Sequence, residues 1–225
     1  MDDTNNEQSR ERVITVPSEA VTLEGVLVVP PEARGVVLFA HGSGSGRFSP
    51  RNNFVARQLQ EAGLATLLLD LLREDEAQDR RFIFDIELLA QRLRSATNWL
   101  RSESETSDLP IGYFGASTGA AAALIAAAQE NANIAAVVSR GGRPDLANEF
   151  LAEVKAPTLL IVGGRDTAVL ALNREALAAL RCPKDLTVVP GATHLFEEPG
   201  TLEKVAELAA HWFLRYLRRQ KEHAA

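Results

Sequence analysis

Ser117 is the residue of this 225-residue chain whose surroundings most clearly suit a nucleophile. It lies in the pattern Gly-Ala-Ser-Thr-Gly (115–119), between a short apolar run and an alanine-rich stretch. A Gly-x-Ser-x-Gly pattern at a strand-to-helix turn holds the serine in a strained backbone conformation, which lifts its hydroxyl clear of the sheet. A glycine-rich turn with a chance serine is the alternative, but the flanking strand and helix patterns favour a nucleophile turn.

Asp166 and His194 follow Ser117 in the chain order serine, acid, histidine. This order is typical of folds in which the nucleophilic serine stands at a strand-to-helix turn. Asp166 comes after the apolar run 157–163 and a Gly-Gly turn, and His194 comes after the next run, 185–190. Because ligands bind at the carboxyl ends of parallel strands, we expect the three side chains to meet at that edge of a sheet. A serine hydroxyl needs a base, neutral imidazole can take its proton near pH 7, and a buried carboxylate holds the imidazole in the correct tautomer.

Other residues compete for the roles of acid and base. Asp145 and Glu197 also lie near predicted loops, and Asp166 has an alternative role as a turn or helix-capping residue. His211 lies within the last predicted helix and His223 in the charged tail, so both are poorer candidates than His194. The order of the strands favours Asp166 as the acid.

A glycine-rich loop, 41–46, follows the apolar run 35–40 and predicts an oxyanion hole. Where a serine at a strand-to-helix turn is the nucleophile, one oxyanion N–H comes from the residue after it, here Thr118, and the second comes from a loop such as this one. We predict Ser43 as the second donor, with Gly42 as the alternative. His41 is expected to be structural, with its ring bonded to nearby loop backbone.

The same loop raises the alternative of a nucleotide site, with Asp70 as a ribose ligand at the end of the following strand. The spacing argues against it. Gly42 and Gly44 are followed by Arg47 where a third glycine is due, a start at Gly44 places Ser49 there, and no Gly-Lys-Ser/Thr follows.

The elements that must position these residues alternate along the chain. Short apolar runs without alternation are typical of strands buried on both faces, and the stretches between them have helical periodicity. We predict an α/β fold, with a mostly parallel sheet flanked by helices, an N-terminal antiparallel pair and no large cap domain. The predicted strands are 12–17, 21–30, 35–40, 64–70, 111–115, 134–139, 157–163 and 185–190, and the predicted helices are 52–61, 82–101, 118–129, 144–154, 169–180 and 202–217.

Length and composition limit the number of domains, the kinds of partner and the location that we expect. The length suits about one domain, which we place at 11–220 between a disordered leader, 1–10, and a tail, 221–225. The formal net charge of -6 makes nucleic acid a poor partner. The single cysteine, Cys182, permits no internal disulfide, and the acidic, polar start is unlike a secretory signal. With no apolar stretch of membrane-spanning length, we expect a cytoplasmic protein without membrane contacts.

Four segments in this order (His-Gly-Ser-Gly-Ser at 41–45, Gly-Ala-Ser-Thr-Gly at 115–119, Gly-Gly-Arg-Asp at 163–166 and Gly-Ala-Thr-His at 191–194) resemble the dienelactone hydrolase-like branch of the α/β-hydrolase superfamily. The resemblance runs from about residue 21 to residue 217. It implies an eight-stranded sheet, no metal, no organic cofactor, and hydrolysis of carboxyl esters or lactones. Dienelactone hydrolases proper use a cysteine nucleophile, whereas this chain has Ser117, which favours a general esterase over dienelactone as the substrate.

The predicted function is therefore a serine hydrolase that cleaves small-molecule esters or lactones through an acyl-enzyme. Arg140 and Arg143, which end another predicted strand at the same edge, are candidates to bind a substrate carboxylate, or alternatively to hold a loop through a salt bridge. The second hypothesis is a non-catalytic binding or scaffold protein on the same fold, and the third is acyl transfer to another acceptor. The N-terminal strands or the last helix offer surfaces for a homodimer.

Overall fold

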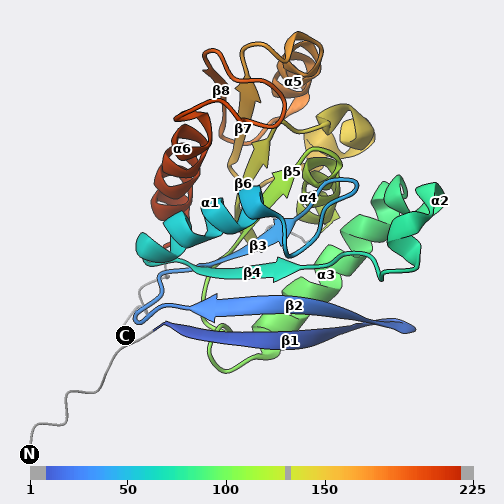
Figure 1. Cartoon of the computed structure of the whole chain (residues 1–225), viewed down its shortest axis with the longest axis vertical. Helices are drawn as coiled ribbons and strands as arrows, with labels where there is room; N and C mark the ends of the chain where they lie inside the picture. The colour runs from blue at the N-terminus through green and yellow to red at the C-terminus, as the bar shows by residue number, and fades with distance from the viewer. Residues whose placement is uncertain (1–8, 130–132, 219–225) are drawn as a thin grey trace, which may run out of the picture.

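An eight-stranded sheet forms the centre of the computed structural model, which describes residues 9–129 and 133–218 (Figure 1). The strands lie in the order β1-β2-β4-β3-β5-β6-β7-β8. β2 pairs antiparallel with β1 and with β4, and the other pairings are parallel, which confirms the predicted mostly parallel sheet. The strands are β1 (Arg10–Ser18), β2 (Val21–Val29), β3 (Val36–Ala40), β4 (Ala65–Leu69), β5 (Ile111–Ala116), β6 (Ile134–Arg140), β7 (Thr158–Gly163) and β8 (Lys184–Val189).

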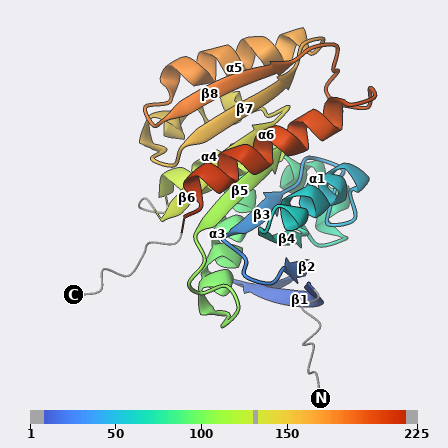
Figure 2. The same ribbon diagram turned by 90° about the vertical axis from the view of Figure 1, so that its left-hand side faces the viewer.

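Helices cover both faces of this sheet, as Figure 2 shows when the molecule is turned by 90°. α1 (Pro50–Glu61) and α6 (Thr201–Tyr216) pack on one face, while α3 (Ile86–Ser102), α4 (Thr118–Gln129) and α5 (Thr167–Ala179) pack on the other. β3, β4, β5 and β7 are therefore buried along their whole length, which is why they read as continuous apolar runs. Each face contributes one hydrophobic cluster to the core.

The predicted helix 82–101 is wrong at its start, because the structure divides this region in two. A short helix, α2 (Arg80–Ile83), ends at Phe84, and α3 begins after Asp85. The Asp85 carboxylate accepts a hydrogen bond from the Leu88 N–H at 3.0 Å. Asp85 therefore caps the start of α3 and separates it from α2. Ahead of α2, Glu76–Gln78 forms one 3-10 turn, η1.

The predicted helix 144–154 is also corrected. Residues Pro144–Glu153 form 3-10 turns, η2, with a non-helical kink at Ala147, where φ is -116°. A 3-10 geometry is common in short connecting pieces, and this one links β6 to β7 without adding a full α-helix to the layer.

The ends of the chain match the predicted boundaries only in part. β1 begins at Arg10, inside the predicted leader, and pairs with β2 as far as Ser18 opposite Val21. The rest of that leader up to residue 8, and the predicted tail 221–225, lie outside the described residues. Among the described residues, no helix combines the length and the apolar character needed to cross a bilayer.

Candidate active site

Ser117 lies at a tight turn between the end of β5 and the start of α4, and its φ of +51° is in the left-handed region. This conformation costs about 1–3 kcal/mol for a residue with a side chain, so the surrounding structure must hold it. The Ser117 N–H donates to the Arg140 carbonyl at 3.2 Å, and the Ser117 carbonyl accepts from the Arg143 N–H at 3.1 Å. The side chain is half-buried, so its hydroxyl is not sealed inside the core.

Gly119 explains why this turn needs glycine. A Cβ at Gly119 would lie 2.2 Å from the Ala40 carbonyl oxygen and 2.4 Å from that of His41. α4 therefore passes directly against the end of β3. This close contact places the nucleophile turn beside the loop that follows β3, and a Cβ on Gly42 would lie 3.0 Å from Ser117 Cβ.

Asp166 and His194 form a direct hydrogen bond, with Nδ1 of the imidazole 2.6 Å from Oδ2 of the carboxylate. Asp166 stands at the N-cap position of α5, but its side chain makes no capping hydrogen bond. Its carboxylate instead faces the imidazole, and its side chain is only 14% exposed. The bond to Nδ1 leaves Nε2 of His194 as the ring atom for other chemistry.

Backbone contacts hold the loops of the acid and the histidine together. The Arg165 N–H donates to the Ala192 carbonyl at 2.9 Å, and the Gly164 N–H donates to the Val189 carbonyl at the same distance. Any Cβ at Gly163 would lie 2.4 Å from the Ala192 carbonyl oxygen, so the two loops touch without a side chain between them. The separation of Asp166 and His194 is thus fixed by the ends of β7 and β8.

The end of β6 and the loop that follows it contact both Ser117 and His194. A Cβ on Gly141 would lie 3.5 Å from Nδ1 and Cε1 of the His194 ring, and the preceding residue, Arg140, accepts the Ser117 N–H. No hydrogen bond joins Ser117 to His194 within residues 9–129 and 133–218. Such bonds are often long in ligand-free enzymes and tighten when substrate binds.

Ser43 and Thr118, the predicted oxyanion donors, are in contact. The Ser43 N–H donates to Thr118 Oγ1 at 3.0 Å, so in the free protein this N–H already has an acceptor. Thr118 is the first residue of α4, where backbone N–H groups have no acceptor within the helix. Gly42, the alternative donor, packs against Ser117 itself.

His41 has two hydrogen bonds to backbone. Its Nε2 accepts from the Leu71 N–H at 2.9 Å, and its Nδ1 lies 3.0 Å from the Gly42 carbonyl, to which it donates in the neutral tautomer. Burial lowers the pKa of His41, because the charged ring is poorly solvated there. The ring therefore joins the glycine-rich loop to the end of β4.

We expect this histidine to make folding stability fall as the pH drops below about 6.5. Its pKa is lower in the folded state than in the unfolded state, so the unfolded chain takes up a proton first and acid favours unfolding. His41→Gln, which keeps an acceptor for the Leu71 N–H, should reduce the loss of unfolding free energy between pH 7 and pH 5.5 by about 1 kcal/mol relative to the wild type. Urea unfolding at each pH measures this slope.

His211→Gln is the matched control, because His211 is exposed on α6 and its replacement should leave the slope close to that of the wild type. Equal slopes for His41→Gln and the wild type would show that His41 does not cause the acid sensitivity.

The other candidate site residues from the sequence differ in the partners that they have in the structure. Arg143 forms a two-pronged ion pair with Asp145, at 2.8 and 2.7 Å, so this pair holds a loop as the alternative reading had it. Glu197 pairs with Arg51 at 3.2 Å. Within the described part of the chain, neither rival acid forms a hydrogen bond or an ion pair with His194. Arg140 is buried at the end of β6, beside the nucleophile turn.

A cavity of about 740 Å³ borders the glycine-rich loop. Gly42 and Ser43 form part of its wall, and apolar side chains from the β4–α3 region, including Leu72, Ile83 and Leu89, form another part. Ser117, His194 and Asp166 do not line it. Sequence analysis missed this cavity because its wall comes from segments that are far apart along the chain.

The sheet, the flanking helices and the turn at Ser117 define an α/β-hydrolase fold without a large cap. Residues 23–221 match the model of the dienelactone hydrolase family, so this chain belongs to that family, which confirms the resemblance found in the sequence.

Three known proteins are similar to this chain over most of its length. A dienelactone hydrolase from Anabaena variabilis, known from a crystal structure, is 56% identical with a TM-score of 0.92, covering 94% of this chain and all of that one. XC6422 from Xanthomonas campestris, described as an α/β serine hydrolase without a lid, has a TM-score of 0.76 at 19% identity, covering 94% of this chain and 97% of that one; at this identity it supports the fold alone.

A Mycobacterium tuberculosis protein named "Putative phosphoribosyl transferase" is 59% identical over 208 residues, which are 92% of this chain but only 47% of that protein. The chain therefore spans about half the length of the curated relatives that it matches first.

Proposed function

We propose that this protein is a serine hydrolase that cleaves carboxyl esters or lactones through an acyl-enzyme. One observation carries the proposal: a carboxylate–imidazole pair 2.6 Å apart stands at the same edge of the sheet as a serine held at φ +51°. This is the arrangement that nucleophilic catalysis by a serine needs.

In the proposed reaction, Ser117 Oγ attacks the ester carbonyl carbon while its proton passes to Nε2 of His194. Asp166 stabilises the imidazolium through Nδ1. The imidazolium then protonates the departing alcohol oxygen as the carbon–oxygen bond breaks, which leaves the acyl group on Ser117. A water molecule attacks this acyl group, gives its proton to His194, and the acid leaves as the proton returns to Oγ.

The developing oxyanion would be held by the N–H groups of Thr118 and Ser43. Because the Ser43 N–H donates to the Thr118 hydroxyl in the free protein, the oxyanion must replace or share that acceptor. Two backbone donors at this point would together contribute several kcal/mol of transition-state stabilisation, roughly 3–4 kcal/mol for each donor.

The transferase name of the mycobacterial relative does not change this proposal. That name applies to a protein of which this chain matches less than half, whereas the dienelactone hydrolase family accounts for residues 23–221 here. The glycine-rich loop also lacks the spacing of a dinucleotide or P-loop phosphate site.

The direct test is to treat the purified protein with a fluorophosphonate probe and to assay it with short p-nitrophenyl esters and simple lactones. We expect one label per chain, on Ser117, loss of labelling after denaturation, and turnover of at least one ester series. A folded protein that takes no label and turns over no ester would support the binding or scaffold reading instead. Faster release of p-nitrophenol with an added alcohol acceptor would indicate acyl transfer.

A further inference from the structure

Arg140 carries a buried positive charge that the fold does not neutralise. The residue ends β6 and is only 8% exposed. Its Nη2 lies 3.5 Å from Asn52 Oδ1, at the outer limit of a hydrogen bond, and its buried Nε has no partner. In the described part of the chain, no carboxylate forms an ion pair with this guanidinium. Burial of an unpaired charge is strongly unfavourable, so this arrangement calls for a partner from outside.

Arg92 shows what a satisfied buried arginine looks like in the same protein. It is 4% exposed, and Glu76 binds both of its terminal nitrogens, at 2.6 and 2.7 Å, while the Leu71 carbonyl accepts a third hydrogen bond. Arg140 has none of these partners, and burial together with the nearby charge of Arg51 lowers the pKa of Arg140 to about 10. The guanidinium still carries its charge at neutral pH.

The first turn of α1 faces Arg140 and has free donors of its own. Pro50 has no N–H, and the Arg51 N–H has no acceptor among the described residues. The Asn52 N–H makes only a long contact, 3.4 Å, with Ser49 Oγ. This 12-residue helix has no acidic residue in its first turn, so nothing on the helix itself offsets the positive end of its dipole.

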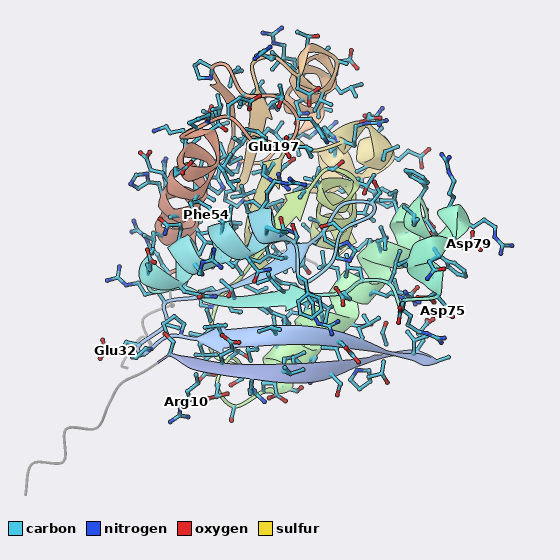
Figure 3. All side chains as sticks on the ribbon, in the orientation of Figure 1. Arg10, Glu32, Phe54, Asp75, Asp79 and Glu197 are labelled. Carbon is cyan, nitrogen blue, oxygen red and sulfur yellow. The ribbon has the colours of Figure 1, made fainter. Side chains whose placement is uncertain are left out.

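This positive region adjoins the candidate active site. The Arg140 carbonyl accepts the Ser117 N–H, and the next residue, Gly141, packs against the His194 ring. On the outer side, Glu197 of the β8–α6 loop lies close to the N-terminal end of α1 and pairs with Arg51 at 3.2 Å (Figure 3). Its side chain is 64% exposed, so it can move away from Arg51 at little cost.

We propose that Arg140, Arg51 and the first turn of α1 form an anion subsite, which binds a carboxylate or phosphate group carried by the substrate. The proposal deepens the proposed function and rests on it, because it assigns the substrate class as esters that bear an anionic group. The anion would take the free donors at Arg140 and α1, and Glu197 would act as a weak internal competitor for Arg51.

The test combines direct binding with kinetics. Binding of inorganic phosphate and of acetate is measured by calorimetry at low ionic strength, which needs no turnover. The ratio of kcat/KM for p-nitrophenyl hydrogen adipate to kcat/KM for its neutral methyl ester then measures preference for an anionic acyl group. The variants are Arg140→Gln, Asn52→Asp, which gives Arg140 a carboxylate partner within the protein, and Glu197→Gln, with Arg57→Gln on the exposed side of α1 as the matched control.

We expect Arg140→Gln and Asn52→Asp to weaken anion binding and to lower the kinetic ratio about tenfold or more, since each removes or neutralises a buried charge. Glu197→Gln should strengthen anion binding about two- to fivefold, and Arg57→Gln should change neither measurement. Asn52→Asp keeps the test valid if Arg140→Gln does not fold, because an aspartate in the first turn suits the helix.

Binding of phosphate only, or of acetate only, would support the subsite and select the anionic group. No binding of either anion, together with an unchanged kinetic ratio in Asn52→Asp, would overturn it even in an active esterase. Anion binding in a protein that hydrolyses no ester would instead refute the proposed function and leave the subsite standing.

Discussion

Replacement of Ser117 by alanine should lower kcat for the best ester about 10⁵- to 10⁶-fold, because the covalent route has no other nucleophile in place. The change removes a single oxygen atom. The backbone bonds from the Ser117 N–H to Arg140 and from the Arg143 N–H to the Ser117 carbonyl remain, so the turn should keep its conformation. Steady-state assays with a sensitive fluorogenic ester, alongside circular dichroism to verify folding, measure the effect.

Ser45→Ala provides the matched control for this variant. Ser45 is an exposed serine of the glycine-rich loop, and within the described ranges its only hydrogen bond is donated by its backbone N–H to the Gly42 carbonyl. We expect Ser45→Ala to retain most of the activity and to react fully with the fluorophosphonate probe. If Ser117→Ala kept more than about 1% of the wild-type rate, a loss far below that of a missing nucleophile, the covalent mechanism would have to be abandoned.

Sequence patterns predicted the parts of the fold that local rules control. The strands are short, apolar and buried on both faces, so their positions follow from composition alone, as for β3 and β7. The turn at Ser117 was predictable because its glycines are demanded by close backbone contacts, such as that of Gly119 with the end of β3. Asp166 and His194 were predictable as neighbours from the order of their strands.

Features that depend on specific side-chain partners were not predictable in this way. The break before α3 depends on Asp85 capping the Leu88 N–H, a local signal that the apolar periodicity of 82–101 conceals. The bond between the Ser43 N–H and Thr118 Oγ1 joins segments 75 residues apart. The sequence pattern treated Arg140 and Arg143 alike, and only the three-dimensional structure shows that Arg143 has Asp145 while Arg140 has no carboxylate partner in the described chain.

The second large effect is expected for Asp166→Asn, which should lower kcat about 10⁴-fold while leaving the fold intact. In the proposed mechanism the Asp166 carboxylate accepts a hydrogen bond from Nδ1–H of His194, and this keeps Nε2 unprotonated and able to take the proton of Ser117. An asparagine of the same shape can turn its NH2 group toward Nδ1, which stabilises the other tautomer with the proton on Nε2. Such an imidazole cannot act as the base, even though every residue stays in place.

Asp145→Asn separates this mechanism from a general loss of negative charge at the same edge of the sheet. Asp145 pairs with Arg143 and does not contact His194, so its replacement should retain most of the activity. The tautomer explanation also predicts the rate of fluorophosphonate labelling. Fluorophosphonate labelling of Asp166→Asn should slow as much as ester turnover, because both reactions need the same base to activate Ser117. Equal rates for the Asp166→Asn and Asp145→Asn variants would mean that the 2.6 Å pair has a structural role, and that the base at Ser117 is oriented by another group.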